Sequence, residues 1–195
     1  MNKLLAIPLL LAMILLPACG ASGPVCLDVL EDGAAFRDIA SGSEMTLDEY
    51  AAEYGVTVAR YAALDLDGDG AEELALWLTL AANEYYGFLI LHAGQDAVHG
   101  HMLNYRQFTD LKADGTFSYS AGVADHGVAR LAFADGAYDA YTLSRLAWSE
   151  SDAAQNVSRY IASEAVTQAD FDEYIAAQAA KPDAAWQALT PAPSA

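Results

Sequence analysis

The chain has 195 residues and a formal net charge of −18 at pH 7, from 27 Asp and Glu against 9 Lys and Arg. A chain this acidic is repelled by phosphate backbones and by anionic headgroups, which argues against a nucleic-acid partner and against electrostatic docking on a membrane. Its length suits a single domain with a sizeable core, and its two cysteines exclude a disulfide framework.

The N-terminus has the parts of a secretory signal peptide. Lys3 supplies the positive charge, an apolar run over 4–16 follows, and small residues precede Cys19. The run is shorter than the ~20 residues that a membrane-spanning helix needs. The stretch "LPAC" resembles the lipobox of bacterial lipoproteins, with Cys19 as the lipidated residue. This resemblance implies a signal peptide over 1–18 and a two-chain lipid anchor on the extracytoplasmic face of the cell membrane.

The alternative is an ordinary signal peptide in which Cys19 is incidental, and a Cys19–Cys26 disulfide then becomes possible. Lipidation instead leaves Cys26 as a lone thiol, either buried or free. The small residues of "GASGP" indicate a flexible tether, so 19–32 is expected to hold the lipidated cysteine and the tether. We expect a single domain over 33–189 and a disordered tail over 190–195.

The first clear helix signal is the pair Thr46 and Glu49, spaced as a capping box. It predicts a helix to about Tyr54, ended by Gly55. From Val56 the apolar residues alternate with a period of two, which is typical of strands. Strands are expected over 57–66, 73–80, 85–92, 97–105, 116–122, 129–134 and 137–150.

Tight turns join these strands, at Gly94–Asp96, Asp114–Gly115 and Asp135–Gly136, which favours an antiparallel meander. Thr167 then opens a second helix, over 168–181, with Pro182 after it. A short helical turn is expected over 183–189. The fold class is therefore predicted as α+β, an antiparallel meander sheet with an N-terminal helix and C-terminal helices.

The stretch "DLDGDGAEEL" places five carboxylates within residues 65–73. Like charges at close range repel, so a cation is the best explanation for this spacing. Oxygen donors at alternate positions wrap around an ion, and the glycine at the sixth position allows the sharp turn. The predicted ligands are the side chains of Asp65, Asp67, Asp69 and Glu73 and the carbonyl of Ala71.

Hard oxygen donors without a nearby His or Cys favour Ca²⁺ over zinc. The twelfth position is Leu76 instead of a bidentate Glu, and a strand follows, so the loop is not an EF-hand. It resembles the strand–loop–strand calcium loops of integrin-type repeats and the first nine positions of dockerin loops. The expected affinity is weak, ~10⁻⁴ to 10⁻³ M. The alternative is a solvated Asp-Gly turn without an ion.

Other candidate sites have weaker signals. His99 and His101 could share one face of a strand, but no third metal ligand is evident. His126 lies beside Asp125, but the Gly-x-Ser-x-Gly motif of a serine nucleophile is missing, so no catalytic residue is assigned. The many tyrosines and tryptophans lie mostly in predicted strands or helices, which favours core packing over a sugar-stacking surface.

The segments "RYAALDLDGDGAEELAL", "YGFLILH" and "FDEYIAAQAAKPDAAW" occur in an order similar to a group of short secreted lipoproteins of gut-dwelling Bacillota. The resemblance runs from about Thr46 to Trp186. It implies a lipoprotein with an acidic calcium-type loop, and it implies no known activity. The expected function is a non-enzymatic binding or accessory domain with a protein or glycan partner. The alternative is a secreted hydrolase acting on glycans or peptides, which needs two carboxylates across a cleft.

Overall fold

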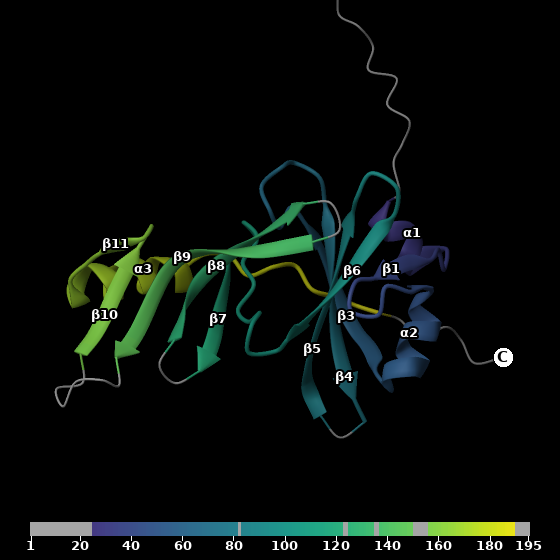
Figure 1. Ribbon diagram of the computed structural model, residues 1–195, viewed down its shortest axis with the longest axis horizontal. Coiled ribbons are helices and arrows are strands. Elements are labelled where there is room, and N and C mark those ends of the chain that lie inside the picture. The colour runs from purple at the N-terminus through teal and green to yellow at the C-terminus, as the bar shows by residue number, and fades with distance from the viewer. Residues whose placement is uncertain (1–24, 82, 123–124, 135–136, 150–155, 190–195) are drawn as a thin grey trace, which may run out of the picture.

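The computed structural model describes residues 25–81, 83–122, 125–134, 137–149 and 156–189. These residues form a seven-stranded sheet, a five-stranded sheet and three α-helices (Figure 1). The helices are α1 (Cys26–Glu31), α2 (Leu47–Tyr54) and α3 (Gln168–Ala179).

The first sheet has the strand order β12-β3-β4-β5-β6-β1-β2. Adjacent strands in this sheet are antiparallel, except that β1 and β6 run parallel, with Arg37 opposite His99. Its strands are β1 (Phe36–Asp38), β2 (Glu44–Met45), β3 (Thr57–Leu64), β4 (Glu73–Leu80), β5 (Asn83–Ala93), β6 (Val98–Asn104) and β12 (Gln187–Ala188).

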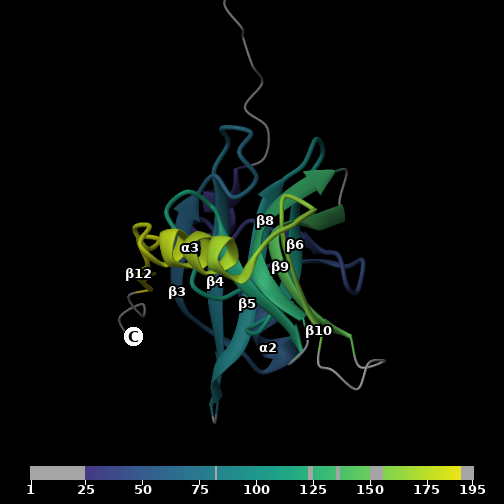
Figure 2. The same ribbon diagram turned by 90° about the vertical axis from the view of Figure 1, so that its left-hand side faces the viewer.

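The second sheet has the order β11-β10-β9-β8-β7, and all its neighbours are antiparallel. Its strands are β7 (Phe117–Gly122), β8 (Asp125–Ala134), β9 (Ala137–Ser149), β10 (Asn156–Ile161) and β11 (Glu164–Ala165). Its β10–β11 end extends away from the first sheet, and Figure 2, viewed from that end, shows α3 beside it.

The class α+β broadly fits this arrangement, but a single antiparallel meander is not confirmed. The strands from β3 to β6 and from β7 to β11 each pair with the next strand in the chain, but β2 and β3 lie far apart in the first sheet. The segment 105–116 also separates β6 from β7, and the strands divide into two sheets. Alternating apolar residues predict a strand but do not say which sheet it joins. The parallel β1–β6 pair also departs from the prediction.

The predicted helices α2 and α3 are present, but one predicted helical segment is not. The capping box at Thr46 is present, with Glu49 Oε2 accepting from the Thr46 N–H at 2.8 Å, and Gly55 has a φ of 64° after α2. However, residues 183–189 do not form a helical turn. Gln187 instead pairs with Tyr61, because the outer edge of β3 offers unpaired main-chain groups.

The N-terminal boundary of the domain also differs from the predicted tether over 19–32. Residues 26–31 form α1, and Cys26 and Val29 on it are buried. The Cys26 thiol donates to the Leu91 carbonyl at 3.3 Å, and burial raises its pKa to about 12. Cys26 is therefore a buried structural thiol, and the folded domain begins before the predicted residue 33.

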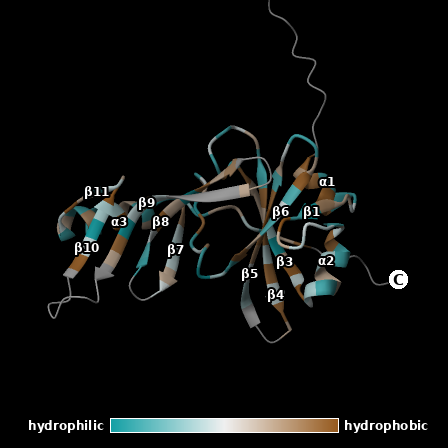
Figure 3. Ribbon diagram, viewed as in Figure 1, coloured by the Kyte–Doolittle hydropathy of each residue, from teal (hydrophilic) through white to brown (hydrophobic). Residues whose placement is uncertain are grey.

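The core lies on both faces of the first sheet. Leu74, Leu76 and Leu78 on β4 face a cluster beneath α1 and α2, whereas Ala75 faces a cluster shared with the second sheet. Burial on both faces explains why β4 and β5 read as nearly continuous apolar runs. In Figure 3, hydrophobic stretches lie in the first sheet and in α1.

Candidate cation site

The acidic loop, defined here as Asp65–Glu73, connects the end of β3 to the start of β4. Gly68 and Gly70 have φ angles of 90° and 93°, in the left-handed region that favours glycine. These two residues let the chain bend back on itself within a few positions. The glycine predicted at the sharpest turn therefore has the conformation that its position requires.

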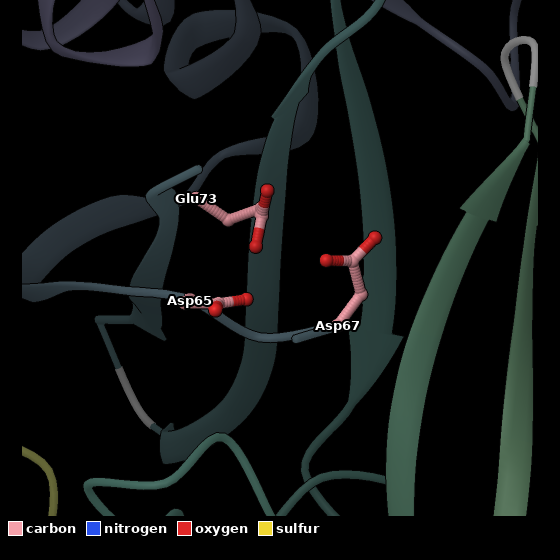
Figure 4. Close-up of side chains that lie close together, drawn as sticks. All are labelled: Asp65, Asp67 and Glu73. Carbon is pink, nitrogen blue, oxygen red and sulfur yellow. The ribbon is translucent and has the colours of Figure 1, made fainter. Parts of the chain in front are cut away.

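The loop brings three carboxylates together (Figure 4). One side-chain oxygen from each of Asp65, Asp67 and Glu73 lies within 4.8 Å of the other two. Ca²⁺ takes oxygen ligands at about 2.3–2.6 Å, so ligands on opposite sides of one ion are roughly 5 Å apart. Oxygens this close together fit a shared hard cation. The arrangement could therefore hold a metal ion.

The charge of this group makes it costly without a counterion. Glu73 is only 1% exposed, and Asp65 and Asp67 are half-buried. Two carboxylates at this separation repel by on the order of 1 kcal/mol in water, and by more where water is partly excluded. A bound cation would replace this repulsion with attraction.

Main-chain hydrogen bonds position the three carboxylates. Asp65 Oδ2 accepts from the Gly70 N–H at 3.1 Å, and Asp67 Oδ1 accepts from the Asp69 N–H at 3.0 Å. Glu73 Oε2 accepts from the Leu66 N–H at 2.8 Å. The Asp67 bond spans two residues and is a turn that Asp forms without any ion, so it also suits the alternative of a solvated Asp-Gly turn.

The other two predicted ligands lie at the exposed apex of the loop. Asp69 is not part of the converging group, and its Oδ1 accepts from the Ala71 N–H at 2.7 Å. Three of the four predicted carboxylates thus converge. The spacing alone could not show this, because a carboxylate at an alternate position can equally cap its own turn.

The second sheet and the segment before it cover one side of the loop. A Cβ atom added to Gly68 would lie 2.8 Å from Arg130 Nη1 on β8, and one added to Gly115 would lie 2.5 Å from the Asp65 carbonyl. Arg130 Nη2 also donates to the Asp114 carbonyl at 2.7 Å. The acidic loop is therefore a point of contact between the two halves of the domain.

His92 on β5 is a neighbour of the site that the sequence reasoning missed. Its Nδ1 lies 3.4 Å from Glu73 Oε1, and its ring stacks on Phe133 of β8 at 4.3 Å between centroids. The register of β4 and β5 places Leu74 opposite Leu91, which brings Glu73 beside His92. Pairing the two strands as an antiparallel hairpin could have revealed this contact from the sequence.

The remaining histidine candidates do not form sites in the described residues. His101 is buried, and burial followed by the nearby His99 lowers its pKa to about 4. His126 is exposed, and Asp125 forms a bidentate ion pair with Arg145 at 2.9 and 2.8 Å. Among the residues that the structure describes, Asp65, Asp67 and Glu73 are the one group of three His, Cys, Asp or Glu that converges in this way.

Several predictions fall on residues that the structure does not describe: the signal peptide over 1–18, the lipidated Cys19, the turn at Asp135–Gly136 and the tail over 190–195. Within the described residues, every helix is too short or too polar to cross a bilayer. No protein-family model matches the chain, and neither curated proteins nor solved structures give a match. The site is therefore interpreted from its own geometry.

Proposed function

We propose that this protein is an extracytoplasmic lipoprotein, anchored to the cell membrane through Cys19, whose domain is a non-enzymatic binding or accessory module stabilised by Ca²⁺ in the acidic loop. The observation that carries the proposal is the convergence of Asp65, Asp67 and Glu73. The lipobox-like "LPAC" and the similarity to secreted lipoproteins support the location.

The donor set favours Ca²⁺ among common ions. All three side chains offer carboxylate oxygen, which hard cations prefer, whereas zinc and copper favour nitrogen or sulfur. Mg²⁺ demands a compact octahedron and retains its water, while Ca²⁺ accepts irregular shells. An irregular loop with one buried and two half-buried carboxylates suits the larger ion.

A structural role for the ion follows from where the loop lies. It joins β3 to β4 and lies against Gly115 and Arg130. An ion held there would fasten the turn of the first sheet to the second sheet. Anything that binds the folded state alone stabilises it by mass action, by about 1.4 kcal/mol at ten times Kd.

Thermal unfolding of the full chain in EDTA and in millimolar CaCl2 tests the ion. We expect Ca²⁺ to raise the Tm by roughly 3–6 °C, and Mg²⁺ at the same concentration to do less. Asp67→Asn should abolish the shift. Asp172→Asn, at an exposed position on α3, removes the same charge and should leave the shift unchanged. An equal Tm in EDTA and Ca²⁺ would contradict the proposal.

Membrane anchoring needs a separate test in a bacterial host. The wild-type chain should partition into the detergent phase and incorporate a radiolabelled fatty acid, whereas Cys19→Ser should do neither. Cys26→Ser is the matched control, because Cys26 lies in the folded domain. Labelling that persists in Cys19→Ser would overturn the assignment of the anchor.

A further inference from the structure

A pocket of about 360 Å³ opens on the face of the first sheet that carries the core cluster shared with the second sheet. It lies between β4, β5, the segment 105–111 and the C-terminal segment 183–186. Six aromatic side chains line it: Trp77, Tyr85, Phe88, Tyr105, Phe108 and Trp186. Its volume lies within the range of roughly 300–1,000 Å³ that small-molecule sites occupy.

The rings around this pocket meet at steep angles. Trp77 is inclined by 80° to Trp186 and by 66° to Phe88, and Tyr85 is inclined by 51° to Tyr105. Neighbouring rings at such angles form walls and do not form one flat platform. A sugar ring stacks best on a flat platform, whereas a compact cation is attracted by ring faces from several directions.

The charged residues among those lining the pocket are both acidic. The side chains of Asp110 and Asp183 are 45% and 77% exposed, so solutes can reach them. Lys112 Nζ binds one oxygen of each, at 2.8 and 2.7 Å, which leaves these three side chains with a net charge of −1. Asp110 is also held at a φ of 52°, which few residues other than glycine adopt.

The chain already places one of its own cations on this aromatic group. The Arg60 guanidinium lies 3.9 Å from the centroid of the Trp77 ring and 5.6 Å from that of Trp186. Arg60 lines a neighbouring hollow and does not line the pocket itself. The rings of Trp77 and Trp186 are thus positioned for contact with a cation.

From these observations we propose that the aromatic pocket binds a small organic cation with an apolar envelope, such as a quaternary or alkylated ammonium group. The ring faces attract the charge and surround its alkyl groups, and Asp110 and Asp183 supply the remaining negative charge. The pocket is distinct from the acidic loop, because Trp77 lies four residues along β4 from Glu73, or roughly 13 Å.

Choline is a suitable probe, because 3,3-dimethylbutan-1-ol has the same shape without the charge. Both are titrated into the full chain by calorimetry and by tryptophan fluorescence, in EDTA and again in CaCl2. We expect choline to bind saturably in both buffers, and the neutral alcohol to bind at least roughly tenfold more weakly. Binding in EDTA would keep this result independent of the proposed calcium site.

Two variants assign the binding to the pocket. Tyr85→Leu keeps apolar bulk at a side chain that is 59% exposed but removes the ring, and Asp110→Asn removes a charge. Each should weaken choline binding by roughly three- to tenfold, whereas Asp172→Asn should have no effect. Circular dichroism confirms that each variant is folded.

Four results would overturn the proposal. Equal binding of choline and the neutral alcohol would mean that the pocket recognises apolar shape alone. Binding of cellobiose without choline would identify a sugar site. Absence of saturable choline binding would mean that the pocket does not take an organic cation. Binding that Asp172→Asn weakens as much as Asp110→Asn would mean that the cation is attracted only by the charge of the whole chain.

Discussion

Glu73 Oε2 accepts a hydrogen bond of 2.8 Å from the Leu66 main-chain N–H, which ties the first residue of β4 to the start of the acidic loop. Both residues are buried, so this bond is shielded from water. It holds one fully buried carboxylate beside those of Asp65 and Asp67. Two properties of the loop, its closure and its charge, therefore depend on one side chain.

Glu73→Gln separates these two properties, because the amide oxygen can still accept from Leu66 but carries no charge. In EDTA we expect the free energy of unfolding to be unchanged or higher, since one of three repelling carboxylates is gone. The stabilisation by Ca²⁺ should be lost. Urea denaturation with and without the ion measures both effects.

Glu73→Ala is the control for closure. It leaves the buried Leu66 N–H without its acceptor and should cost about 1–3 kcal/mol with or without Ca²⁺. A full calcium response in Glu73→Gln would show that Glu73 is not a ligand.

Gly70→Ala tests the backbone of the loop. No heavy atom lies within 4 Å of the position that a Cβ would take at Gly70, so only its φ of 93° opposes a side chain. Forcing an L-residue into this conformation should cost about 1–2 kcal/mol of folding free energy. Gly122 also has open space but no positive φ, and Gly122→Ala should be nearly neutral. Equal effects of the two substitutions in urea denaturation would contradict the strained turn.

His101 should make stability depend on pH. Burial, reinforced by His99 and His92 and opposed by Asp38, lowers its pKa to about 4 from the ordinary 6.5. Between these values the unfolded chain binds a proton that the folded protein does not. The contribution of neutral His101 to the free energy of unfolding is therefore fully present above pH 6.5. As the pH falls to about 4, this free energy decreases by up to about 3 kcal/mol.

Urea denaturation across pH 4–7 measures this dependence. His101→Phe should flatten the curve in this window, and His126→Phe, at an exposed position, should not. The carboxyl of Asp114 titrates below this pH window. Burial raises its pKa, but hydrogen bonds from Lys181 and Thr116 outweigh burial and lower the pKa to about 2. A slope that survives in His101→Phe would assign the pH dependence to other groups.

Features that depend on a few adjacent residues could be predicted from the sequence. The apolar run after the acidic loop indicated β4 over the residues that it occupies, and the spacing of Thr46 and Glu49 indicated a capping box that is present. Carboxylate spacing indicated three side chains that converge, Asp65, Asp67 and Glu73. It could not separate them from Asp69, because the same spacing also permits an Asp side chain to bond its own turn.

The sequence by itself determined the acidic loop, its glycine turns and the capped helix, because hydrogen bonds and sterics within about five residues decide such features. Only the tertiary structure decided that the strands divide between two sheets, that His92 and Arg130 lie at the loop, and that Trp77, Tyr105 and Trp186 share one pocket. Those contacts join segments far apart in the chain, so they depend on how the two sheets pack together. An alternating pattern marks a face for burial but not the partner that covers it.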